Sequence, residues 1–410
     1  MKNKDVRYYD IDAARTFVMF VAVFIHGSNV YSPHDPMRTA NTERFYIFDW
    51  FSSALHMFIS PTFFIVGGFF SIFLLERYGL KKFVLKRFSR VGIPMVFALL
   101  TVNVLEHFLR YRDHFAPRDG ALDFWAYLSS DHLAKVFAQG EWLHIWFLVQ
   151  LALSFLVVIT GCAIFQQLKL KGDFFLKILD RLVRIATFGP VPVLTLILCL
   201  TGLQFAAITL STLLPAPYSP FQVAGIGIIS PYNFAFYFVY FLAGLCLYWN
   251  NRLYETVFKW EIWMVPLALV SLALQIKPEF FELPTALENA VFGLHLALKW
   301  ITILTTLKLF HHYFRDKPSK TLLHMSDATM TVYVFHHVFV YLLGDFFVSI
   351  HWPVFIEWAI IVTASVSAAM AIHLFLVKPS TIMRFIINGQ TGTPRSIAKP
   401  KPVLKETGAS

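Results

Sequence analysis

The sequence predicts an all-α polytopic membrane protein, built as a bundle of about ten transmembrane helices. Three observations lead to this fold class: the composition, ten apolar segments, and the charges between those segments. Of the 410 residues, 57% are hydrophobic and only 15% are charged, whereas soluble domains carry about 25% charged residues. The mean hydropathy is +0.59. These values exclude an ordinary soluble protein before any motif is considered.

Ten apolar segments divide the chain, and most of them supply the roughly 20 residues that a helix needs to cross a bilayer. They lie at about 11–31, 45–75, 91–109, 142–165, 185–210, 231–249, 262–276, 287–310, 329–350 and 353–377. The segment 45–75 is longer than a bilayer requires, so we expect it to begin outside the membrane or to tilt strongly. The segment 262–276 is short for a span.

The connecting segments alternate in charge along the chain. The N-terminus, the segments 76–90 and 166–184, and the chain beyond residue 378 are basic, whereas 211–230 carries no charge and 277–286 is net acidic. Because Lys and Arg favour the cytoplasmic side of a membrane, the pattern predicts that both termini are cytoplasmic. The net charge of +10 is therefore interpreted as a topology signal and not as a surface for nucleic acid.

The chain is expected to form one membrane domain over residues 1–380, followed by a basic cytoplasmic tail over 381–410. The end of this tail is polar and rich in proline and glycine, and we expect it to be disordered. The first apolar run continues to about Tyr31 without a small-residue cleavage site, which predicts an uncleaved span and not a signal peptide. The three cysteines lie in or beside apolar segments and show no disulfide or zinc spacing.

The first apolar segment, AARTFVMFVAVFIHGSN at 13–29, contains two ionisable residues, Arg15 and His26. Their separation of 11 residues is close to three helical turns, so both point to one face, about 16 Å apart along the axis. In the predicted orientation Arg15 lies near the cytoplasmic surface and His26 in the outer half. An arginine at this depth can simply snorkel, and a histidine can be hydrogen-bonded inside the bundle, but ionisable residues in membrane segments are also candidates for function.

Further histidines lie at membrane depth, namely His56, His144 and the neighbours His336 and His337. Adjacent residues on a helix point about 100° apart, so we expect at most one of that pair to face a given cavity. Because no histidine pair at i, i+4 and no carboxylate–histidine pattern is visible, no metal is expected. Histidine suits proton transfer near neutral pH, which favours general-base chemistry with His144 or His336 assisting His26.

A basic motif, KKFVLKRFSRVGIP at 81–94, brings Lys86, Arg87 and Arg90 to the expected cytoplasmic mouth. Positive charges at this place also set topology and attract anionic lipids. Arg87 and Arg90 are three residues apart and are therefore neighbours on one helical face. Paired guanidinium groups match the spacing of phosphate oxygens, so the motif predicts a phosphate-binding site.

Together these elements resemble the acyltransferase-3 family of integral membrane O-acyltransferases. The resemblance is carried by DIDAAR with Arg15 and His26, FFIVGGFF at 63–70, KRFSRVGIP at 86–94 and HIWFL at 144–148. It is greatest to a glucan-modifying branch, through the segments 7–32, 79–95 and 332–344, and runs from about Arg7 to Pro379. Gly67 stands where the family usually has serine. With Gly68 it permits close approach of another helix or of a ligand.

The resemblance implies a cytoplasmic acyl donor and an acceptor hydroxyl on an extracytoplasmic glycan. In the glucan-modifying branch the implied reaction transfers succinyl from succinyl-CoA to osmoregulated periplasmic glucans at the bacterial inner membrane. It also implies that His26 is the functional histidine, Arg15 its paired arginine, and Arg87 and Arg90 the basic motif. We therefore expect acyl-CoA as a substrate, no permanently bound cofactor, His26 as general base, and Lys86, Arg87 and Arg90 at the donor phosphates.

Other functions remain open at this stage. An O-acetyltransferase acting on another envelope glycan, a glycan or lipid transporter, and a regulatory membrane protein would share much of this pattern. The missing inverted repeat and the lack of broken helices in matching halves argue against a transporter. Ser28 is the only serine near His26, which disfavours a covalent acyl-enzyme. A succinyl carboxylate would need a nearby cation, and the candidates, which otherwise face solvent, are Arg38, Arg44, Arg110 and Arg112.

Overall fold

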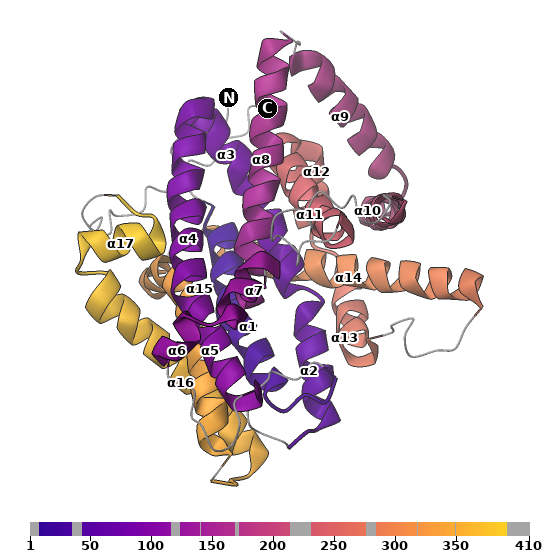
Figure 1. The fold of residues 1–410 in the computed structure, drawn as a ribbon. Coiled ribbons are helices and arrows are strands. Elements are labelled where there is room, and N and C mark those ends of the chain that lie inside the picture. Colours follow the sequence, from indigo (N-terminus) through magenta and orange to yellow (C-terminus); the bar gives the residue numbers. More distant parts are fainter. Residues whose placement is uncertain are drawn as a thin grey trace.

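A computed structural model gives the structure of the chain and describes residues 8–34, 43–115, 124–139, 141–168, 172–213, 231–275, 284–317, 319–348 and 350–391 (Figure 1). Within these ranges the secondary structure is helical, with no β-strand. The expected all-α membrane fold is therefore confirmed. The side of the membrane on which each terminus lies stays a prediction.

The longer helices follow the expected apolar segments. They are α1 (Tyr9–Asn29), α2 (Tyr46–His56), α3 (Ile59–Arg87), α4 (Ile93–Leu100), α5 (Val102–Phe115), α8 (Trp146–Gln167), α10 (Pro192–Thr212), α11 (Pro231–Trp249), α13 (Met264–Leu274), α14 (Thr285–Phe314), α15 (Lys320–Phe347) and α16 (Val354–Ile372). Shorter or amphipathic elements connect them: α6 (Phe124–Leu128), α7 (Asp131–Gln139), η2 (Leu143–Ile145), α9 (Gly172–Ala186), α12 (Asn251–Phe258) and α17 (Thr381–Asn388), with π-helical turns η1 (Phe88–Gly92) and η4 (His373–Val377).

Eight helical stretches in the described part of the chain are long and apolar enough to cross a membrane. One of them, Tyr46–Tyr111, contains both the second and the third expected segments in 66 continuous residues. The expected seventh segment forms α13, which has only 11 residues and is too short to span a bilayer as a straight helix. Each of the ten apolar segments is thus mostly helical where the structure describes it, but not every one is a separate full-length span.

The chain reverses its direction within α3, at Gly79. This residue has φ 74° and ψ 168°, which interrupts the helix, and a positive φ favours glycine. Nη2 of Arg87 lies 3.5 Å from Oγ of Ser71, although 16 residues of straight helix would separate them by about 24 Å. The segment 76–90, expected to be a loop, is therefore mostly helical and folds back on the first half of α3. Phe83 anchors it because its ring is fully buried.

The paired glycines of α3 serve helix packing. A Cβ atom added to Gly68 would lie 2.0 Å from the Phe241 carbonyl oxygen, and one added to Gly244 would lie 2.0 Å from the Ile65 carbonyl oxygen. Helices α3 and α11 therefore cross with their backbones nearly in contact, which small residues allow. Of the two roles open to this motif, the structure supports close approach of a second helix.

Two further elements differ from the expected loops and tail. Helix α9 occupies most of the basic segment 166–184. It exposes apolar side chains such as Leu182 and Ile185 and also carries Arg181 and Arg184. Such a helix suits the membrane surface. Helix α17 lies inside the expected tail and packs against α4 and α15 at the edge of the bundle (Figure 1). Residues 392–410 lie outside the described residues.

Candidate functional site

Helix α1 lies inside the bundle and runs parallel to α15. Near its start, Nη2 of Arg15 donates a 2.7 Å hydrogen bond to Oγ of Ser326. Eleven residues later, the His26 ring contacts the ring of His337, 11 residues beyond Ser326, with a centroid distance of 4.5 Å. The equal spacing means that the two helices stay in register over about 16 Å. The face shared by Arg15 and His26 is therefore the face that α15 covers.

Four histidine rings form a cluster at the far end of this face. His26 lies 4.5 Å from His337 and 5.2 Å from His336, measured between ring centroids. The ring of His144, from η2, lies 4.5 Å from that of His337 and 5.4 Å from that of His336. The structure thus brings together the three predicted histidines, His26, His144 and His336, and adds His337.

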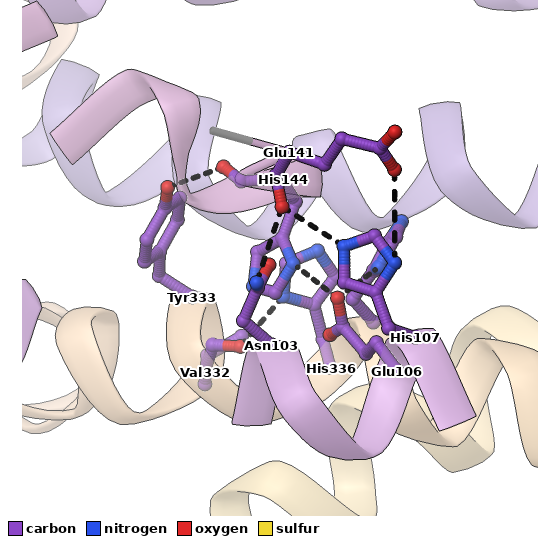
Figure 2. A network of polar contacts seen from close by, with 9 residues as sticks. Asn103, Glu106, His107, Glu141, His144, Val332, Tyr333 and His336 are labelled. Atoms are coloured by element: carbon purple, nitrogen blue, oxygen red, sulfur yellow. Dashed lines mark hydrogen bonds and ion pairs between the residues drawn. The ribbon is translucent and has the colours of Figure 1, made fainter. Parts of the chain in front are cut away.

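The expectation that only one of His336 and His337 faces a given site is wrong. Both rings lie within 5.4 Å of the rings of His26 and His144, measured between centroids. Nδ1 of His336 donates a 2.8 Å hydrogen bond to the Val332 carbonyl, which leaves Nε2 as the free lone pair of the neutral ring. Tyr333 donates its hydroxyl hydrogen to the His144 carbonyl (2.5 Å) and so fixes η2 against α15 (Figure 2).

Glu106, on α5, supplies a carboxylate at the centre of this cluster. Its Oε2 lies 3.0 Å from Nδ1 of His144 and 3.1 Å from Nδ1 of His337. Figure 2 shows the Glu106 side chain reaching toward the histidine rings between α5 and α15. Glu106 is fully buried, and a buried carboxylate is stable only when it is paired and hydrogen-bonded. The histidines are its partners, and the cluster is one polar network in an apolar bundle.

The sequence interpretation missed Glu106. A signal was present, because this residue interrupts the apolar segment 91–109, and an acidic residue inside a membrane segment marks a candidate site. It was overlooked because no histidine lies at the spacing that a single helix would need. The partners His144 and His337 are 38 and 231 residues away and meet Glu106 only through the packing of three elements.

Exposure separates His26 from its neighbours. His144, His336 and His337 are buried, with 5%, 1% and 6% of their surface exposed, whereas His26 is partly exposed. Nε2 of His144 and Nε2 of His336 are buried and have no hydrogen-bond partner among the described residues. His26 is therefore the most exposed member of the cluster.

A second candidate cluster lies at the opposite end of the same face, where two arginines from different helices meet. The guanidinium of Arg15 lies 6.0 Å from the ring centroid of Phe70, and that of Arg87 reaches the adjacent Ser71. Arg87 also stacks on Phe155, with 4.4 Å to the ring centroid. The charges of Arg15 and Arg87 interact with each other, and Nε of each is buried without a hydrogen-bond partner in the described part of the chain.

The arginine pair differs from the predicted one. The sequence paired Arg87 with Arg90 on one helical face, but Arg90 is exposed whereas Arg87 points inward. Lys86 is exposed and lies 4.4 Å from the ring centroid of Tyr78. The reason is the reversal at Gly79, which directs Arg87 toward α1. Among the described residues, the anionic contact of this arginine pair is Asp12, 3.3 Å from Arg15, so two guanidinium groups share one carboxylate and the pair favours an anionic ligand.

The remaining candidates occupy other positions. His56 is exposed at the end of α2. Nη1 of Arg44 donates to the carbonyls of Val30 and Glu43 and so fixes the loop after α1. Arg110 lies on α5, one turn beyond Glu106, and interacts electrostatically with His337. The side chains of Arg38 and Arg112 lie outside the described residues.

Replacing Glu106 with glutamine is expected to lower the turnover number by about 100-fold, within the range of general acid–base effects, while the donor KM stays unchanged. The amide keeps the shape but removes the charge that holds the histidine rings. Glu141→Gln is the matched control, because the Glu141 side chain is 43% exposed and lies 3.9 Å from His107. Full activity in Glu106→Gln would remove this carboxylate from the account.

Three of these groups could also coordinate a metal ion. Donor atoms of Glu106, His144 and His337 lie within 4.8 Å of one another. However, Nδ1 of His144 already has a hydrogen-bond partner in Glu106 at 3.0 Å, so the carboxylate and this ring are paired through a proton without a metal ion. We expect elemental analysis of the purified protein to find far less than one transition metal per chain and activity to survive chelators. A stoichiometric metal lost in Glu106→Gln would contradict this expectation.

The fold and the two clusters define a class: a multi-helix membrane protein with a basic site and a histidine site joined along one helix. Residues 8–117 match a family model described as "Acyltransferase domain", a stretch that contains Arg15, His26, Arg87 and Glu106. The comparisons confirm the expected resemblance to the acyltransferase-3 family and the expectation of an acyltransferase.

Curated relatives extend the similarity over nearly the whole chain. "Glucans biosynthesis protein C" of Escherichia coli O139:H28 (strain E24377A / ETEC) is 23% identical over 391 residues, covering 94% of this chain and 95% of the relative. The protein of the same name from Shigella dysenteriae serotype 1 (strain Sd197) is 24% identical with the same coverage. No solved structure matches the chain.

Proposed function

We propose that the protein is a membrane O-acyltransferase that moves a succinyl group from cytoplasmic succinyl-CoA to hydroxyl groups of a periplasmic glucan. One observation carries the proposal: α1 presents Arg15 in an anion-binding pair and His26 in a carboxylate-backed cluster on one face. The two lie about 16 Å apart. A donor held by its phosphates at one end can therefore present its thioester at the other.

The donor phosphates are assigned to the arginine pair. Arg15 and Arg87 come from helices that converge on Phe70 and Ser71, and charge-assisted hydrogen bonds from guanidinium groups suit phosphate oxygens. Arg90 and Lys86 are exposed nearby and add long-range attraction for a polyanionic nucleotide. The pantetheine arm would extend alongside α1 from the arginine pair toward His26.

His26 is assigned as the general base. It removes the proton of the acceptor hydroxyl as the oxygen attacks the thioester carbonyl, and the tetrahedral intermediate collapses with cleavage of the carbon–sulfur bond. The proton then passes from His26 to the departing thiolate, which yields free CoA and the glucan ester. Glu106 acts as a positioning residue, because its carboxylate holds His337 and His144 behind His26 and offsets the positive charge that develops on the imidazole.

Succinyl is favoured over acetyl because a cation lies close to the histidine cluster. The free carboxylate of a succinyl group needs such a partner, and Arg110 lies on α5 within electrostatic range of His337. Arg44 is less suited, since its Nη1 already donates to two backbone carbonyls. The name of the curated relatives refers to glucans, which supports a glucan as acceptor. A periplasmic acceptor and a cytoplasmic donor would place the protein in the bacterial inner membrane.

Mass spectrometry of periplasmic glucans tests the proposal in cells. Glucans from a strain that lacks the gene are expected to lose their succinyl additions, and a plasmid with the intact gene should restore them. Loss of acetyl additions alone would favour an O-acetyltransferase. Unchanged glucans in the deletion strain would contradict the proposed acceptor.

A further inference from the structure

The chain segment at the end of α17 contacts both elements that hold the arginine pair. On one side, Oγ of Ser89 donates a 2.6 Å hydrogen bond to the Gly389 carbonyl, and Ser89 lies in η1, between Arg87 and Arg90. On the other side, Nε2 of Gln390 donates a 2.8 Å hydrogen bond to Oδ1 of Asp327. Asp327 follows Ser326, which is the hydrogen-bond partner of Arg15.

The contact with η1 depends on a glycine. Gly389 adopts φ +60°, and a Cβ atom added there would lie 1.8 Å from the Ser89 carbonyl oxygen and 2.6 Å from Cα of Arg90. These neighbours are backbone atoms, so they can move only if the π-helical turn itself moves. The backbone of residue 389 therefore rests directly on the turn that follows Arg87.

The contact with α15 is a buried polar network. Oγ1 of Thr331 donates to Oδ1 of Asn388 at 2.9 Å and lies 3.0 Å from Nδ1 of His373. Nδ2 of Asn388 donates to the Asp327 carbonyl at 3.3 Å. Asn388 and His373 are only 3% and 2% exposed, and buried hydrogen bonds of this kind fix a unique arrangement. The segment is thus anchored on α15 one residue from the partner of Arg15.

We propose that residues 384–390 form a clasp that sets the position of the Arg87 turn relative to Arg15, and so determines the affinity for the donor diphosphate. The proposal rests on the proposed function, in which these arginines hold the CoA phosphates. Arg15 is hydrogen-bonded to Ser326 of α15, and Arg87 directly precedes η1. The clasp hydrogen-bonds to α15 and to η1, and so connects the supports of the two arginines. Its residues do not touch the donor. They act as positioning residues.

The test is a kinetic comparison of full-length variants in detergent or nanodiscs. Gly389→Ala should raise the KM for acyl-CoA by about 10-fold or more, which corresponds to the loss of one charge-assisted hydrogen bond. The Kd for free CoA, measured by calorimetry, should rise by the same factor. The turnover number at saturating donor should stay within about 2-fold, because the histidine cluster is about 16 Å away. Gly161→Ala is the matched control, since a Cβ there meets no atom within 4 Å.

A second variant covers the case in which Gly389→Ala fails to fold. Gln390→Ala removes two hydrogen bonds of one side chain, its bond to Asp327 and the one that it accepts from Arg384, and should raise the donor KM by about 10-fold. Unchanged donor affinity in a folded Gly389→Ala or Gln390→Ala protein overturns the clasp, as does a loss confined to the turnover number. A wild-type protein that binds no CoA would instead overturn the proposed function.

Discussion

Replacing His26 with alanine is expected to lower acyl transfer by about 100- to 10,000-fold, the usual contribution of a general base, while the protein still accumulates in the membrane. His26 is the partly exposed residue of a cluster whose other members are buried, so it is the member best placed to meet an acceptor hydroxyl. The measurement is the release of free thiol from succinyl-CoA together with ester formation on glucan.

The control for this variant is His312→Ala. His312 is exposed at the end of α14 and lies outside both clusters, so its loss should leave transfer near the wild-type rate. If the His26→Ala protein retains near-wild-type acyl transfer, another residue must be the general base. His336 would then be the first to test, because its Nε2 is buried without a described hydrogen-bond partner.

Replacing Arg87 with alanine is expected to weaken donor binding by about 10- to 150-fold, the range for loss of hydrogen bonds to a charged group. Arg15→Ala should have a similar effect, because both guanidinium groups converge on Phe70 and Ser71. The Kd for CoA, measured by calorimetry on the purified proteins, checks both. The turnover number should change less than the affinity, since neither residue contacts the histidine cluster.

Exposed basic residues provide the comparison. Lys86→Ala removes a charge from the neighbouring position, but the Lys86 side chain is exposed and its ammonium lies over Tyr78, so we expect an affinity loss below about 5-fold, as for a surface charge. If Lys86→Ala weakens CoA binding as much as Arg87→Ala does, the arginine pair is not a specific site. The basic motif would then act only through its net charge.

Much of this architecture could be predicted from the sequence, because the bilayer imposes long apolar helices that periodicity and composition report directly. The face shared by Arg15 and His26 followed from the pitch of one helix and is preserved in α1. The reversal at Gly79 was not predicted, since the basic segment reads equally well as a loop or as a helix. That reversal decides which arginine meets Arg15.

The histidine cluster shows where sequence reasoning stops. His26, His144 and His336 were predicted individually, because each is an ionisable residue in an apolar segment. Their mutual contacts, and the carboxylate of Glu106 among them, depend on the packing of α1, α5, η2 and α15. No local spacing encodes a contact between residues 106 and 337, so only the folded chain brings these groups together.

The clasp illustrates the same limit at the C-terminus. Residues 381–391 lie beyond the last apolar segment, and their composition suggested a tail. Three features instead hold them to the bundle: the Ser380 cap, whose Oγ accepts from the Met383 amide, the buried Ile387, and the left-handed Gly389. Each is a short-range signal, and together they place the end of α17 against η1, the turn that follows Arg87.

The most direct test of the central claim is transfer by the purified protein. Wild-type protein in nanodiscs, mixed with labelled succinyl-CoA and unmodified periplasmic glucan, should release CoA and form succinylated glucan in equal amounts, and His26→Ala should form neither above background. Intact thioester in the presence of folded wild-type protein and glucan, or equal transfer by His26→Ala, would contradict the account.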